Sequence, residues 1–225
     1  NAGWQNRNFG KAAIISTTNI RYGIEVSDSS FIQTQQFVLS HNFYFPKPIP
    51  NAKWIPVSLR DKFRTVFSFN AGNTERKDLF NLTTVNGSWG YEFQSKNASF
   101  SLRLPNIEYS YLKPKQKLID LFTSNPSLEY IFTDGLISSV IAGVTINGAK
   151  DKVVKIFRAN AELSGLVTGL VQNKFLDENL YRFLKLDAEV IRKIIFPKSA
   201  LVLRLFSGVG YEFNSTSNVA KRNNL

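Results

Sequence analysis

Very few residues in this chain are of the types that carry out covalent chemistry. The 225 residues include no Cys and a single His, His41, so thiol nucleophiles, zinc–thiolate sites and multi-histidine metal sites are ruled out and the usual nucleophile–base triads lack partners. Asp187 and Glu189 are two residues apart, a spacing that could serve acid–base chemistry, but the neighbouring Lys185 favours a structural charge cluster. Glycine-rich phosphate loops are missing as well. We therefore predict no enzymatic activity, no catalytic residue, no metal site and no cofactor.

The strong positive charge narrows the classes of partner. The formal net charge is +11 and the isoelectric point is about 9.8, a balance that suits nucleic acid, an anionic membrane surface or a polar lumen. The cations are scattered, and no RNA-binding signature or basic helix accompanies them. We therefore predict no nucleic-acid partner. No run of about 18 apolar residues occurs either, so the sequence predicts no transmembrane helix.

The elements that would position these side chains follow a period of two. In 157–168, Phe157 and Leu163 fall on one face of an extended chain, and Arg158 and Glu162 fall on the other, as expected of a strand with one apolar and one polar face. The same alternation, clean or less regular, occurs in residues 1–9, 12–26, 31–45, 63–73, 86–94, 98–112, 137–147, 184–190 and 201–213. The pattern predicts about ten antiparallel strands separated by turn residues.

One short helix is expected in the connection formed by residues 113–134. Asn125 could cap it, Pro126 suits the first helical position, and Leu128 and Phe132 would share a face. The rest of the chain shows no domain boundary or repeat of fixed period. The sequence therefore predicts an all-β domain with a small helical addition in one loop.

Alternation alone does not distinguish a membrane barrel from a soluble sandwich or barrel. Several expected strands reach the about 9–11 residues that a tilted strand needs to cross a bilayer. Aromatic residues such as Phe43, Trp89 and Tyr211 lie near expected strand ends, which is typical of the girdles of outer-membrane barrels. Charges of both signs occupy the polar faces, where a hydrated lumen or a solvated outer surface would accommodate them. The charges that we assign to a lumen are Arg21, Arg158, Glu162, Lys185, Asp187, Glu189, Arg204 and Glu212.

The order of several segments resembles the barrel of the BamA/TamA family of outer-membrane proteins, nearest to the TamL-type members of Bacteroidota. Residues 3–10, with Lys11 departing from the family pattern, resemble the second strand and the first periplasmic turn. Residues 41–46 resemble the second periplasmic turn, and residues 124–135 resemble a loop of the TamL-type proteins. Residues 186–189 and 200–211 resemble the tenth and eleventh strands. Each segment is short, so the likeness depends on their order and spacing along nearly the whole chain.

This resemblance implies that residues 1–225 are one partial barrel domain, holding about strands 2 to 11 of a closed antiparallel transmembrane β-barrel of roughly sixteen strands. The first strand, the later strands and the periplasmic POTRA domains would lie outside this chain, as would the arginine motif of the sixth loop. In the family, incoming strands pair with the edge at the seam between the first and last strands. Trp4 and Phe9, on the strand beside that seam, are the expected seam-adjacent or interfacial aromatic residues.

The function that the resemblance implies is the assembly of proteins into the bacterial outer membrane, as a non-enzymatic insertase or translocase for β-barrel or surface proteins. The expected partners are unfolded outer-membrane proteins, outer-membrane lipid and a periplasm-spanning TamB-like protein. Two alternatives stay open at this point. One is a passive outer-membrane channel or transporter barrel, in which lumen cations select anions, and the other is a soluble β-barrel that binds an apolar ligand.

Overall fold

The structure of the chain is a computed structural model that describes residues 1–27, 30–50, 62–132, 134–165 and 180–213. It contains ten strands and two short helices. The strands are β1 (Ala2–Phe9), β2 (Ile14–Ser27), β3 (Ser30–Phe45), β4 (Phe63–Arg76), β5 (Phe80–Gln94), β6 (Ala98–Pro114), β7 (Gly135–Lys150), β8 (Val153–Ser164), β9 (Phe183–Ile195) and β10 (Ala200–Glu212). The helices are α2 (Gln116–Ser124) and α3 (Ser127–Ile131).

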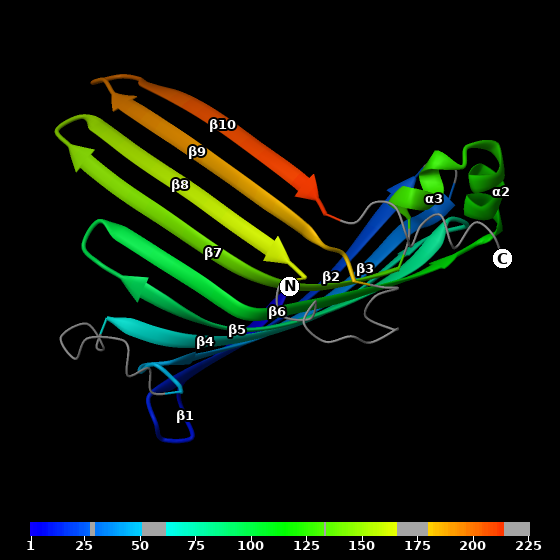
Figure 1. Ribbon diagram of the computed structural model, residues 1–225, viewed down its shortest axis with the longest axis horizontal. Helices are drawn as coiled ribbons and strands as arrows, with labels where there is room; N and C mark the ends of the chain where they lie inside the picture. The colour runs from blue at the N-terminus through cyan, green and yellow to red at the C-terminus, as the bar shows by residue number, and fades with distance from the viewer. Residues whose placement is uncertain (28–29, 51–61, 133, 166–179, 214–225) are drawn as a thin grey trace.

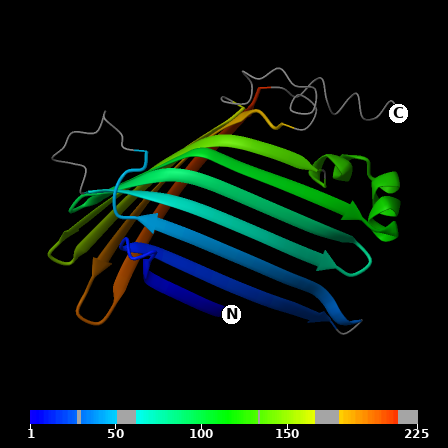
Figure 2. The ribbon, with the colours of Figure 1, turned by 90° about the horizontal axis from the view of Figure 1, so that it is seen from below.

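All ten strands form one sheet in the order of the sequence, and each strand pairs antiparallel with the next. The predictions of an all-β chain and of about ten antiparallel strands are thus confirmed. The sheet does not close on itself, because β1 and β10 are its two edges. It is nevertheless strongly twisted and curled, since β9 and β10 run obliquely behind the strands of the first half when the molecule is seen from below (Figures 1 and 2).

The two ends of the sheet differ in their connections (Figure 1). At the turn end, short links of residues 10–13, 95–97, 151–152 and 196–199 join successive strands. At the helical end, α2 and α3 follow β6. The ring of Phe132 lies 5.8 Å from that of Phe80 in β5 and 6.3 Å from that of Phe122 in α2, so the helices pack on the helical end of β5.

The helical connection corrects one sequence prediction in detail. We expected a single helix capped by Asn125, and the described part of this connection has two. Asn125 ends α2, where its backbone N–H donates to the carbonyl of Leu121, and Pro126 precedes α3 without a side-chain cap. The helix α2 was not predicted because Lys115, at its N-cap position, also provides no side-chain hydrogen bond, so the usual sequence signal for a helix start is missing.

The register gives the sheet two continuous faces. A row of cross-strand partners that runs from β4 to β10 defines the polar face. The row formed by the adjacent residue of each strand, one step nearer the turn end, defines the apolar face. The polar-face row is Arg64, Glu92, Ser101, Gly143, Asn160, Asp187 and Gly208. The apolar-face row is Phe63, Phe93, Phe100, Val144, Ala159, Ala188 and Ser207. Because side chains alternate with a period of two, each strand contributes every second residue to each face.

A bulge in β6 keeps these faces continuous. Arg103 pairs with Gly90 and Asn106 pairs with Ser88, so Leu104 and Pro105 together oppose a single residue of β5. A bulge of this kind shifts the alternation by one residue, and a proline is tolerated at such a position. As a result the polar face of β6 changes from odd-numbered to even-numbered residues along the strand.

The described part of the chain buries very little apolar surface. Its only large hydrophobic residues that are buried are Val66, Leu112, Leu118 and Leu180. Strands of a soluble antiparallel sheet normally pack one face on a core. Here residues 46–50 cover a small part of the apolar face near Thr65, and the rest of that face has no covering layer among the described residues. None of the described helices is long and apolar enough to span a bilayer.

Candidate functional site: the two faces of the sheet

The polar face is hollowed near the turn end. A cavity of about 710 Å³ lies over β4 to β8, and the polar-face residues that line it are Arg64, Glu92, Gln94, Ser99, Ser101, Gly143, Thr145 and Asn160. The curl of the sheet in Figure 2 accounts for a hollow on one face. The cavity is also lined by Phe63, Phe93, Phe100 and Val144, so its lining combines polar and apolar groups. In the described residues no group of His, Asp or Glu side chains is arranged to hold a metal ion.

Two carboxylates on the polar face are each held between two arginines. Glu92 of β5 accepts from Arg64 Nε of β4 at 2.7 Å and from Arg103 Nη2 of β6 at 2.7 Å. Glu189 of β9 accepts from Arg158 Nη1 of β8 at 2.9 Å and is also paired with Arg204 of β10. We call these the β5 triad (Arg64–Glu92–Arg103) and the β9 triad (Arg158–Glu189–Arg204). Each triad joins three adjacent strands by charge-assisted hydrogen bonds, which are stronger than neutral ones.

A chain of side-chain hydrogen bonds crosses the polar face from β4 to β8, nearer the helical end than the triads. Asn70 Nδ2 donates to Asn86 Oδ1 at 3.2 Å, and Asn86 Nδ2 donates to Asn106 Oδ1 at 3.0 Å. Asn106 Nδ2 then donates to Ser139 Oγ at 3.1 Å, and Ser139 Oγ donates to Glu162 Oε1 at 2.8 Å. We call this chain the polar ladder. It joins β4 to β8 and ends on the carboxylate of Glu162. An ionised carboxylate accepts hydrogen bonds but has no proton to donate.

The apolar face carries large hydrophobic side chains in an exposed setting. On the edge strand β10, Leu205 is 72% exposed, Val209 is 63% exposed and Tyr211 is 65% exposed. Many other apolar-face side chains are exposed, including Tyr22, Phe37, Phe69, Val85, Phe100, Ile107, Phe157, Leu186 and Val190. Monomeric soluble proteins rarely expose apolar patches larger than a few hundred Å², so a face of this kind requires an apolar neighbour.

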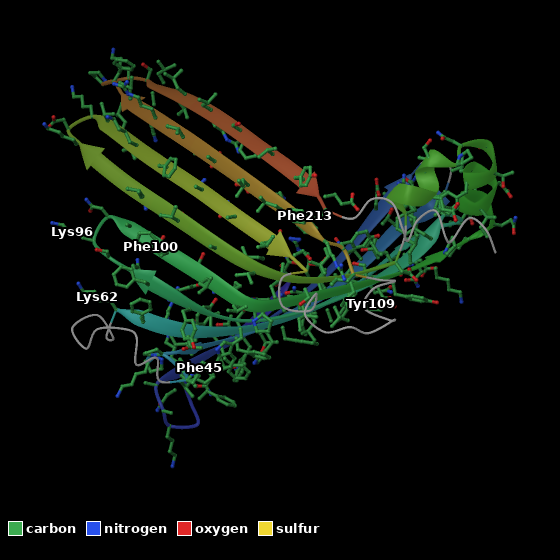
Figure 3. All side chains as sticks on the ribbon, in the orientation of Figure 1. Phe45, Lys62, Lys96, Phe100, Tyr109 and Phe213 are labelled. Carbon is green, nitrogen blue, oxygen red and sulfur yellow. The ribbon has the colours of Figure 1, made fainter. Side chains whose placement is uncertain are left out.

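Aromatic rings gather on the apolar face at the turn end. The ring of Phe43 in β3 lies 5.3 Å from that of Phe9 and 6.4 Å from that of Phe67 in β4, and the ring of Phe67 lies 6.0 Å from that of Trp89 in β5. A second group joins the rings of Phe63, Phe93 and Phe100. Figure 3 shows Phe45 and Phe100 toward the turn end, with Tyr109 and Phe213 toward the helical end. The rings therefore lie toward both ends of the strands.

The connection after β3 folds back onto this aromatic region. Thr65, which is fully buried, donates its hydroxyl to the carbonyl of Lys47 at 3.0 Å and accepts from the N–H of Ile49 at 2.7 Å. The carbonyl of Ile49 accepts from Trp89 Nε1 at 3.1 Å and from the hydroxyl of Tyr91 at 3.2 Å. Residues 46–50 are therefore fixed on the apolar face, and they satisfy the polar atoms of three side chains that lie there.

The structure places all of the charges assigned to a lumen on one face. Arg21 pairs with Val38, Glu162 with Lys185 and Glu212 with Phe183. The alternation of side chains along each strand places these residues on the polar face. The remaining assigned residues are Arg158, Asp187, Glu189 and Arg204, which are also on this face. The contacts that form are mainly between strands: Asp187 accepts from Asn160 Nδ2 at 2.7 Å, and Glu189 is bound within the β9 triad.

Trp4 and Phe9 lie on the opposite, apolar face. Trp4 pairs with Thr18, whose partner in β3 is His41, and the ring of Phe9 contacts that of Phe43. The two rings are 56% and 43% exposed. His41, on the same face, has its Nδ1 2.8 Å from Thr18 Oγ1 and lies against the ring of Phe43.

Sequence analysis missed the β5 triad and the polar ladder. Both depend on which residues of neighbouring strands are opposite each other, and that register cannot be read from alternation within one strand. Glu92 and Asn86 lie in the expected strand 86–94, but nothing in the sequence identified their partners. Comparison of the chain with models of protein families, with curated proteins and with solved structures found no match.

Proposed function

We propose that this chain forms part of the wall of a transmembrane β-barrel in a bacterial outer membrane. The observation that carries the proposal is the exposed apolar face of a ten-stranded antiparallel sheet whose other face holds the triads and the polar ladder. Lipid would cover the first face, and the second would line a hydrated interior, as in barrels of this class. A soluble barrel would instead turn its apolar face inward, onto a core or ligand.

The dimensions of the strands support the same proposal. Nine of the ten strands contain between 12 and 17 residues, and β1 contains eight. A tilted strand needs about 9–11 residues to cross a bilayer. In lipid, unpaired backbone groups are costly, so the open edges β1 and β10 would have to pair with further strands to complete a barrel.

Within this class, we propose that the chain belongs to an assembly factor of the BamA/TamA type, which inserts β-barrel or surface proteins into the outer membrane. The support comes from the segments that resemble that family. Residues 3–10 span most of β1 and the start of the turn after it, residues 41–46 end β3, and residues 186–189 and 200–211 lie in β9 and β10. Their order along a meander of paired strands agrees with the family's barrel.

The proposed activity would act at a strand edge. Edge strands present unpaired N–H and C=O groups that another chain can complete. Trp4 and Phe9 would lie in the membrane interface beside that edge, where they would disturb lipid packing and ease the entry of a strand. Unfolded outer-membrane proteins would be the substrates, and a periplasm-spanning TamB-like protein would be a partner.

The test uses the intact protein that contains this chain, reconstituted in liposomes. An unfolded outer-membrane barrel is added, and its folding is followed by the change in gel mobility of unheated samples. We expect faster folding than in liposomes without the protein. Equal folding rates would refute the assembly activity. Large, steady and anion-selective conductance in planar bilayers would instead support a passive channel.

A matched pair of substitutions tests the role of the ring beside the edge. Trp4 and Tyr22 are 56% and 55% exposed on the same face, but Trp4 lies on β1, beside the proposed seam, and Tyr22 lies on β2, one strand further from it. Trp4→Ala should reduce the folding rate of the substrate more than Tyr22→Ala does. Equal effects would assign both rings to general anchoring in the interface.

A further inference from the structure

Three cations lie together on the apolar face at the turn end of β7, β8 and β9. Lys155 is directly opposite Arg192 of β9 on one side and Gly148 of β7 on the other. Lys150 is two residues beyond Gly148, on the same face of β7. All three cationic side chains are exposed. We call Lys150, Lys155 and Arg192 the basic cluster.

This arrangement is unfavourable unless an anion is present. Like charges directly opposite each other on neighbouring strands destabilise a sheet, because their Cβ atoms are about 4.5–5.5 Å apart. Among the described strands, the one acidic residue on the apolar face is Glu75, which lies at the helical end and is paired with Lys115 at 2.7 Å. Asp151 occupies the turn next to Lys150, whereas Lys155 and Arg192 lie further along their strands, away from it.

The surroundings of the basic cluster are apolar on the side toward the middle of the sheet. Two residues from Lys155 and Arg192, toward the middle of the sheet, Phe157 is opposite Val190. On the other side of Arg192, its partner in β10 is Leu203. These three side chains are exposed. A Cβ atom added at Gly148 would meet no atom within 4 Å, so the position opposite Lys155 on β7 is open. The cations therefore border an exposed apolar surface and have room for a ligand between them.

We propose that the basic cluster binds the phosphate of an anionic phospholipid in the membrane leaflet at the turn end. The inference rests on the proposed function, because it requires the apolar face to contact lipid. Phe157, Val190 and Leu203 would then contact the acyl chains, and the cations would lie at the depth of the headgroups. Arg192 offers a planar fork of donors that matches phosphate oxygens, and Lys155 adds a second charge. The bound phosphate would also relieve the repulsion between the two cations.

The test measures lipid preference beside Arg192. Leu203→Trp is introduced into the intact protein, which is reconstituted in phosphatidylcholine vesicles containing increasing fractions of brominated phosphatidylglycerol or brominated phosphatidylcholine. The protein without this substitution is measured in the same vesicles, and its quenching, which comes from the other tryptophans, is subtracted. A juxtamembrane cation contributes about 1 kcal/mol toward an anionic lipid, so we expect quenching to show at least about a fivefold preference for phosphatidylglycerol.

Variants of the basic cluster and a matched control complete the design. Lys155→Gln with Arg192→Gln should reduce the preference to nearly equal binding of the two lipids. Lys193→Gln removes a charge from the residue next to Arg192, on the polar face, and should leave the preference unchanged. Addition of inorganic phosphate should not abolish the preference if the cluster takes a lipid headgroup.

The outcomes separate this inference from the proposed function. The inference is overturned if the double variant keeps the preference, if Lys193→Gln removes it equally, or if inorganic phosphate abolishes it. If neither brominated lipid quenches the introduced tryptophan, the apolar face does not contact lipid, and the proposed membrane barrel itself is refuted. Quenching without a preference refutes the lipid site alone.

Discussion

The assignment of the two faces can be tested at neighbouring positions in the middle of β3. Leu39 lies on the apolar face between Ile20 and Ala71, and Ser40 lies on the polar face between Asn19 and Asn70. Both side chains are half-buried. An arginine introduced at either position would therefore lie at nearly the same depth but on opposite faces of the sheet.

The expected difference follows from the environments of these two positions. Arginine on the lipid face near the middle of a bilayer costs about 2–4 kcal/mol, which corresponds to roughly a 25- to 700-fold change in the folding equilibrium. At Ser40 the new side chain would meet asparagine side chains and water, so we expect the free energy of unfolding to change by less than about 1 kcal/mol. Leu39→Arg should thus be far more damaging than Ser40→Arg.

The assay is equilibrium unfolding of the intact protein in lipid vesicles, followed by gel mobility and by protection from protease. Leu39→Arg and Ser40→Arg are compared with the unmodified protein at the same lipid composition. Equal free energies of unfolding for the two variants would refute the membrane orientation. A larger loss for Ser40→Arg would mean that the polar face, and not the apolar face, is turned toward lipid.

Two further predictions concern polar atoms that the structure shows to be satisfied. Asn106→Leu should lower the free energy of unfolding by about 1–3 kcal/mol, because it leaves Asn86 and Ser139 without their partner in the polar ladder; a loss below about 0.5 kcal/mol would show that the ladder is not formed. Thr65→Val should speed hydrogen exchange of the Ile49 amide by about fivefold, since a hydrogen bond contributes about 1 kcal/mol; unchanged exchange at Ile49 would contradict the described fold-back of residues 46–50.

The strands and their faces were predictable because the alternation of apolar and polar residues depends only on positions within one strand. Alternation at 157–168 and at 201–213 placed strands where β8 and β10 are found, although β8 ends at Ser164 and Thr168 lies outside the described residues. The eight charges that we grouped from this alternation lie on one face. A period of two is sufficient for this result, because it fixes which residues share a face without requiring any knowledge of the neighbouring strands.

The less regular pattern at 98–112 has a physical cause in the bulge. Phe100 and Leu102 are apolar-face residues before it, and Ile107 and Tyr109 are apolar-face residues after it. The alternation therefore changes phase at Leu104 and Pro105. A search for uninterrupted alternation cannot follow such a change, although a proline within a strand is a signal of a bulge.

The contacts between charges were less predictable. Sequence analysis assigned Arg158, Glu162, Arg204 and Glu212 to a lumen but did not identify their partners. In the structure Arg158 and Arg204 both bind Glu189, on the strand between them. Successive residues on one strand face are about 6–7 Å apart along the strand, so Arg158 and Glu162, four residues apart, are separated by about 13 Å. Residues directly opposite on neighbouring strands are only about 4.5–5.5 Å apart. The nearer partner is across the sheet, and identifying it requires the register.

The polar ladder has a mechanical consequence. Backbone hydrogen bonds allow two antiparallel strands to form a similar number of bonds after a slip of two residues, so they resist shear only weakly at that step. One hydrogen bond of the ladder crosses each boundary from β4 to β8, and a slip of two residues at any of these boundaries separates the pair that joins the two strands. The ladder thus makes β4 to β8 a plate that resists shear as one unit, and sliding between strands is expected first outside it.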